Sequence, residues 1–241
     1  MNDNPFSPGF PQSGNLRLSD EEQSRQQADF FAKVYGWMAA GLALTGGVAL
    51  FAASSPAVQQ LVFGNKLVFF GLIIAELALV GFLSARVFQW SRSQVQAAFI
   101  AYAALNGLTL SVIFLVYTMD SIASTFFTSA LMFGTMSAYG YFTKSDLSGW
   151  GKLLSMALIG LVIAMVVNIF LGSTTLSLIT SGIGVLLFTA LTAYDTQKLK
   201  GLALAVEGEA SDNASILGAL TLYLDFINLF LFLLRFFGRR R

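Results

Sequence analysis

The chain alternates between long apolar stretches and short polar breaks. Seven stretches are each long enough to cross the ~30 Å hydrocarbon core of a bilayer as a helix. They cover residues 34–54, 67–85, 95–117, 121–142, 152–172, 175–196 and 214–236. None shows the alternation of apolar and polar residues that is typical of a membrane β-strand. The pattern therefore predicts an all-α integral membrane protein, a bundle of seven transmembrane helices.

The N-terminal 28 residues differ from the rest of the chain, because they hold three of the four prolines and no apolar signal-peptide core. We predict a mostly disordered tail over residues 1–28 and a transmembrane domain over residues 29–241. Ser19 is followed by Glu22 three residues later, which is the spacing of a capping box. A short amphipathic helix on the membrane surface is therefore expected where the tail ends.

Composition supports a membrane protein and excludes several kinds of site. Hydrophobic residues make up 56% of the 241 residues and charged residues only 11%, whereas soluble domains carry about 25% charge. The net charge of +1 and the scattered basic residues give no surface for nucleic acid. Cysteine and histidine are both absent, which excludes disulfides, thiolate and imidazole metal ligands and imidazole-dependent triads. We expect no cofactor, and a pH response between about 5 and 8 must come from carboxylates.

The basic residues in short loops predict the orientation. With the N-terminus inside, the inner loops hold Arg86, Arg92, Lys144, Lys152, Lys198 and Lys200, whereas the outer loops hold Lys66. We therefore expect a cytoplasmic N-terminus. Seven crossings would place Arg239–Arg241 outside against the same rule, unless the last segment is re-entrant. Because "LYLDFINLFLFLLRFF" contains no Gly or Pro to break it, we predict a true crossing.

Asp225 interrupts the last apolar stretch, and a charge at the bilayer centre costs about 2.5–3.5 kcal/mol on insertion scales. Asp195 lies near the end of the sixth stretch, on the same helix face as Thr192. Two antiparallel helices can bring both carboxylates into one interior site. Because two carboxylates in a poorly hydrated place cannot both ionise cheaply, we expect them to share a proton and titrate as a unit. Doubly ionised, they would attract a hard cation such as Ca²⁺. Alternatively, Asp195 is a simple interfacial residue beside Lys198.

The second stretch contains Glu76 and ends at Arg86, ten residues later. Ten residues span about 15 Å of helix, so the two side chains cannot pair with each other. Arg86 could latch an ionised aspartate, and Glu76 could add a ligand to the metal site of Asp195 and Asp225. The alternatives are a structural hydrogen bonder for Glu76 and a topology charge for Arg86.

Other residues indicate helix packing. Ala130, Gly134 and Ala138 recur at four-residue steps, which favours close helix approach. Asn106 lies on a face with Tyr102 and is expected to hydrogen-bond between helices.

The motifs "AYDTQKL" and "LYLDFINLFLFLLRFFG" resemble those of the Bax inhibitor-1 family, also called the transmembrane Bax inhibitor motif family. The resemblance covers roughly residues 30 to 238. It implies a bundle with the last helix central, and a pH-sensitive calcium leak controlled by an aspartate pair, here Asp195 and Asp225. It also implies an arginine latch and an acidic residue in the second segment, matched to Arg86 and Glu76. The acidic loop "EGEASDN" is longer than in many relatives.

Two other functions compete with the leak. Intramembrane aspartyl proteases also use two aspartates, but they need Gly-x-Gly-Asp and Pro-Ala-Leu, and no proline follows Pro56; we therefore do not expect an enzyme. The alternative is an interaction protein, because some bacterial relatives resemble modulators of a membrane-bound AAA+ protease, which the N-terminal tail could engage. Resemblance and the lack of organelle signals favour a bacterial inner membrane.

Overall fold

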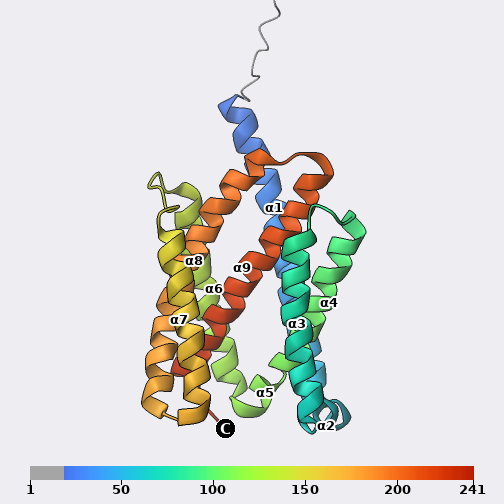
Figure 1. Cartoon of the computed structure of the whole chain (residues 1–241), viewed down its shortest axis with the longest axis vertical. Helices are drawn as coiled ribbons and strands as arrows, with labels where there is room; N and C mark the ends of the chain where they lie inside the picture. Colours follow the sequence, from blue (N-terminus) through green and yellow to red (C-terminus); the bar gives the residue numbers. More distant parts are fainter. Residues whose placement is uncertain (1–18) are drawn as a thin grey trace, which may run out of the picture.

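The architecture is all-helical, as predicted. A computed structural model describes residues 19–241 of the chain. In this range the helices are α1 (Asp20–Ser54), α2 (Pro56–Phe63), α3 (Lys66–Arg86), α4 (Arg92–Leu110), α5 (Val112–Val116), α6 (Met119–Phe142), α7 (Trp150–Leu171), α8 (Thr174–Ala205) and α9 (Gly208–Phe237). They pack as a bundle in which successive long helices run in opposite directions (Figure 1).

Six helical segments between residues 19 and 241 are long and apolar enough to cross a membrane: α1, α3, α4 with α5, α7, α8 and α9. The fourth predicted span, α6, is not among them, although it has 24 residues. Its serines and threonines lower its hydropathy, and several of them, such as Ser129 and Ser137, are buried against the other helices. The crossing of α6, and with it the count of seven, stays a prediction.

The first helix is longer than the sequence pattern suggested. The Ser19 hydroxyl accepts a hydrogen bond from the Glu22 N–H, and the Glu22 carboxylate accepts one from the Ser19 N–H, so the predicted capping box is confirmed. However, this capping box starts α1 itself. The short surface helix that we expected and the first membrane span form one continuous helix. The rest of the predicted tail, residues 1–18, lies outside the described residues.

The most buried helix is α9. In its apolar stretch of 18 residues, 72% of the stretch is buried inside the bundle, compared with 44% for the corresponding stretch of α8 and 6% for that of α3. It packs against α1, α4, α6 and α8, and Figure 1 shows it running obliquely through the bundle. The acidic segment "EGEASDN" is not a long loop as predicted, because α8 ends at Ala205 and α9 begins at Gly208.

The C-terminal residues pair with the segment between α5 and α6. The Thr118 N–H donates to the Arg239 carbonyl at 3.1 Å, and the Arg241 N–H donates to the Val116 carbonyl at 2.9 Å. Since α9 is uninterrupted over 30 residues, it has no break of the kind that a re-entrant segment needs. The C-terminus lies at the opposite end of the bundle from the start of α1 (Figure 1).

Glycine allows close approach on α6, although at a different position from the predicted one. Gly134 and Ala138 are exposed, and a Cβ at Gly134 would meet nothing within 4 Å. By contrast, a Cβ at Gly140 would collide with the backbone of Ala193 on α8. The repeat of small residues therefore predicted the wrong face of this helix, because spacing alone does not say which face meets a neighbour.

Candidate functional site

Asp225 lies deep in the bundle. Its side chain is 5% exposed, and its Oδ2 atom has no hydrogen-bond partner among the described residues. Its neighbours along α9, among them Leu222 and Phe226, are buried apolar residues. An uncompensated buried polar atom is costly in an apolar place, and the carboxyl group would keep its charge only with a partner.

The nearest acidic group to Asp225 from another helix is Asp195, which cannot stabilise a negative charge on Asp225. It lies on α8, which packs closely on α9, and its carboxyl group is close enough to the Asp225 carboxyl for the two groups to interact electrostatically. Lys198, one turn further along α8, is also within electrostatic range of Asp195. The structure therefore brings the two predicted aspartates together. A hydrogen bond between two carboxyl groups requires one of them to hold a proton.

Small residues let α8 and α9 approach each other on either side of the aspartates. A Cβ on Gly184 of α8 would lie 2.5 Å from the ring of Phe232 on α9. On α9, a Cβ on Gly218 would lie 3.0 Å from the Leu199 side chain of α8. Both glycines thus lie at the interface of α8 with α9, and Thr192, on the same face of α8 as Asp195, is fully buried.

Glu76 belongs to a different polar cluster. Its carboxylate accepts hydrogen bonds from Thr109 Oγ1 at 2.9 Å and from Asn106 Nδ2 at 3.4 Å. Asn106 Oδ1 accepts a hydrogen bond from the Tyr223 hydroxyl at 3.1 Å, and that hydroxyl lies 2.7 Å from Thr45 Oγ1. The cluster connects α1, α3, α4 and α9. Asn106 is therefore interhelical, as expected, and Glu76 is a structural hydrogen bonder in this arrangement.

The predicted metal set of Asp195, Asp225 and Glu76 is not assembled. Among residues 19–241 no three acidic side chains gather where they could hold a metal ion. The reason is the position of α3, which packs on α4, whereas the aspartates lie between α8 and α9. Asp195 and Asp225 remain together as a pair without Glu76.

Arg86 lies at the exposed end of α3. Within the described part of the chain it forms no ion pair with either aspartate. At this end of the bundle the ion pairs centre instead on Asp212, which bonds Lys33 at 2.7 Å and Arg92 at 2.9 Å. Sequence reasoning did not single out Asp212, because it lies in a segment that was taken for a loop. Exposed pairs of this kind contribute little stability, about 0–1 kcal/mol.

The chain is similar to known membrane proteins over most of its length. A family model described as "Inhibitor of apoptosis-promoting Bax1" matches residues 27–241. The inner membrane protein YbhL of Escherichia coli strain K12 is 56% identical over 215 residues, covering 88% of this chain and 92% of the relative. A protein of Deinococcus radiodurans is 47% identical over 220 residues, covering 91% and 94%. One from Caulobacter vibrioides is 37% identical and covers 100% of both chains.

Proposed function

Because this chain belongs to the Bax inhibitor-1 family, we propose that it is a pH-sensitive calcium leak channel gated by Asp195 and Asp225. The observation that carries the proposal is the pair of neighbouring carboxyl groups between two helices of a membrane bundle. Ionisable residues inside membrane proteins are expensive, and they commonly mark ion or proton pathways. We further propose that the enclosed α9, which carries Asp225, is the central helix of the channel.

The gating follows from the charge of the pair. With one shared proton the two carboxyl groups attract each other through a hydrogen bond and hold α8 against α9. When that proton leaves, two negative charges repel each other in a poorly hydrated interior and favour separation of the helices. The same two charges provide oxygen ligands that suit Ca²⁺. Loss of one proton thereby both opens the path and makes it attractive to the ion.

The arginine latch is proposed for a conformation other than this one. Arg86 is exposed at the end of α3, so it has to move to reach an ionised aspartate. A guanidinium that did so would neutralise one of the two negative charges and close the path again, since its planar fork binds a carboxylate through two hydrogen bonds. Glu76 is left out of the ion site that we propose.

We place the channel in the inner membrane, in keeping with the name of its Escherichia coli relative. The N-terminus is proposed to face the cytoplasm, since the loops on that side carry most of the Lys and Arg residues. Modulation of a membrane-bound AAA+ protease stays the alternative function. Its proposed carrier is the N-terminal tail, most of which lies outside the described residues.

Calcium flux into sealed vesicles tests the proposal directly. We expect purified protein in liposomes loaded with a Ca²⁺ indicator to pass Ca²⁺ without any other protein, at a rate that changes with pH. Protein-free liposomes prepared from the same lipid give the background. A flux equal to that background at every pH would contradict the leak and favour the interaction protein.

A further inference from the structure

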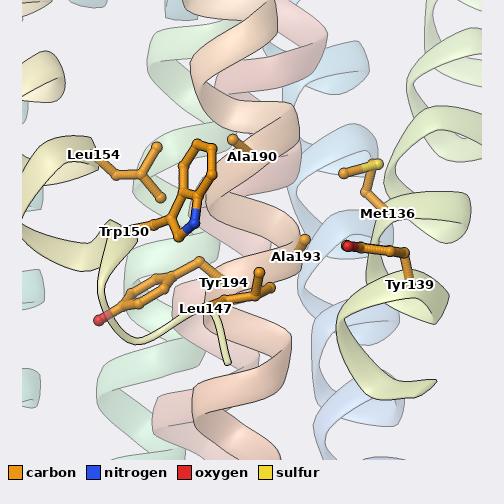
Figure 2. A pocket seen from close by; sticks show the side chains of 8 residues that line it. All are labelled: Met136, Tyr139, Leu147, Trp150, Leu154, Ala190, Ala193 and Tyr194. Atoms are coloured by element: carbon orange, nitrogen blue, oxygen red, sulfur yellow. The ribbon is translucent and has the colours of Figure 1, made fainter. Parts of the chain in front are cut away.

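A cavity lies between α6, α7 and α8. Its lining includes no residue of α9, the helix that carries Asp225. It has a volume of about 190 Å³ and is lined by Met136, Tyr139, Leu147, Trp150, Leu154, Ala190, Ala193 and Tyr194. Figure 2 shows the rings of Trp150 and Tyr194 on one side of it, and Met136 and Tyr139 on the other. Drug-sized ligands occupy about 300–1,000 Å³, so this cavity suits a narrower, apolar group.

A polar pocket of about 430 Å³ adjoins the cavity, and Tyr194 lines both. Its other lining residues come from the segment between α6 and α7 and from the last turns of α8: Lys144, Ser145, Asp146, Ser148, Gln197, Lys198 and Gly201. Gln197 fixes this segment on α8, because its Oε1 accepts from the Leu147 N–H at 2.7 Å and its Nε2 donates to the Ser145 carbonyl at 2.8 Å. The pocket is therefore held by specific hydrogen bonds.

The charges of the polar pocket favour an anion. Neither Lys144 nor Lys198 forms a salt bridge within residues 19–241, although Lys198 feels the charge of Asp195. Asp146 adds a negative charge to the same pocket. Hydrogen bonds from the Ser148 hydroxyl and N–H lower the pKa of Asp146, so it stays ionised. Among the residues that line the pocket, two lysines against one aspartate leave one net positive charge.

The pocket and the cavity lie where α6 ends and α7 begins. Trp and Tyr side chains are typical of the headgroup level of a bilayer, and Trp150 and Tyr139 are both exposed here. This end of the bundle also holds the lysine-rich loops, and basic pockets between transmembrane helices bind anionic lipid headgroups. An apolar cavity beside a cationic pocket at this level matches the two parts of a phospholipid.

We propose that this site binds one anionic phospholipid, with its phosphate at Lys144 and Lys198 and the upper part of one acyl chain beside Trp150. The lysines select a lipid with net negative charge over a zwitterionic lipid, because a zwitterionic headgroup carries its own ammonium. Ala190 and Leu154 provide the apolar wall for the chain. Lipid binding at this site requires no calcium flux.

Native mass spectrometry of the full chain tests the site, with phosphatidylglycerol and phosphatidylethanolamine of identical acyl chains supplied in equal amounts. We expect one retained phosphatidylglycerol per protein, with about 5-fold preference, because one net positive charge near the phosphate contributes about 1 kcal/mol. The double variant Lys144→Ala and Lys198→Ala should lose this preference. Lys66→Ala, a lysine at the start of α3, should keep it.

The cavity is tested separately with Ala190→Phe, which fills it and leaves both lysines in place. We expect this variant to retain less phosphatidylglycerol while its unfolding midpoint in detergent stays close to that of the wild type. Equal retention of the two lipids by the wild type would overturn the proposal, as would an unchanged preference in the lysine double variant. Displacement of the lipid by millimolar inorganic phosphate would also overturn it, because the site would then be a simple anion site.

Discussion

Gly140 allows α6 to contact the backbone of α8 two residues before Asp195, and Gly140→Ala tests how tightly this contact fixes the aspartate. A Cβ at Gly140 would collide with the Ala193 carbonyl oxygen and lie 2.9 Å from the Ala193 Cα. The obstacle is backbone in the middle of a helix, so no side chain can turn away to relieve it. Overpacking of this kind costs about 1–3 kcal/mol. Against this, replacing glycine with alanine in a helix gains about 0.5–1 kcal/mol.

Gly134→Ala is the matched control, because Gly134 lies on the same helix and a Cβ there meets nothing within 4 Å. Both variants gain the same helix propensity, so their difference isolates the collision. We expect Gly140→Ala to unfold more easily than Gly134→Ala by about 1–3 kcal/mol, or about 5- to 150-fold in the unfolding equilibrium. Reversible unfolding in mixed micelles of SDS and a mild detergent, followed by tryptophan fluorescence, measures this difference. Equal free energies of unfolding for the two variants would refute the close contact between α6 and α8.

Other substitutions address the polar cluster, the latch and the C-terminus. Tyr223→Phe removes the hydroxyl that donates to Asn106 at 3.1 Å and should cost about 1 kcal/mol in the same unfolding assay; Tyr139→Phe, an exposed tyrosine, should cost nothing, and equal effects would deny the cluster any role in stability. Arg86→Ala should raise calcium flux at a pH where the aspartates are ionised, because the proposed latch acts on an ionised aspartate, and Arg86→Lys should restore closure only in part; wild-type flux in both would leave Arg86 as a topology charge. A cysteine added after Arg241, in a chain without cysteine, should react with an impermeant thiol reagent outside intact cells; labelling only after the membrane is opened would place the C-terminus inside.

The helices and the aspartate pair could be predicted from the sequence for a simple physical reason. Apolar stretches must be helical in a bilayer, and α8 and α9 follow each other with a connection of two residues, Val206 and Glu207, so they pack side by side. Asp195 shares a helix face with the polar Thr192, and two antiparallel helices can turn such a face and Asp225 toward each other. The assumption that consecutive helices pack together therefore predicted correctly that Asp195 lies next to Asp225.

Contacts between helices distant in the chain were not predictable in the same way. Glu76 pairs with Asn106 and Thr109 because α3 packs on α4, and no local pattern separates that neighbour from α8 or α9. The close contact at Gly140 was also missed, since the repeat through Gly134 looked more regular than the lone glycine. Helix ends were the least predictable feature, because polar segments such as residues 20–28 and 208–213 remain helical beyond the apolar stretch.

The central claim is that Asp195 and Asp225 form one titrating unit that gates calcium. Calcium flux of Asp225→Asn in liposomes, compared with wild type between about pH 5 and 8, tests it most directly. The amide keeps the size and hydrogen bonding of the carboxyl group, so the variant should fold, which its unfolding midpoint checks. We predict that wild-type flux rises as the shared proton is lost with increasing pH, and that flux through Asp225→Asn no longer depends on pH. An Asp225→Asn variant that folds and keeps the wild-type pH profile would contradict the aspartate gate.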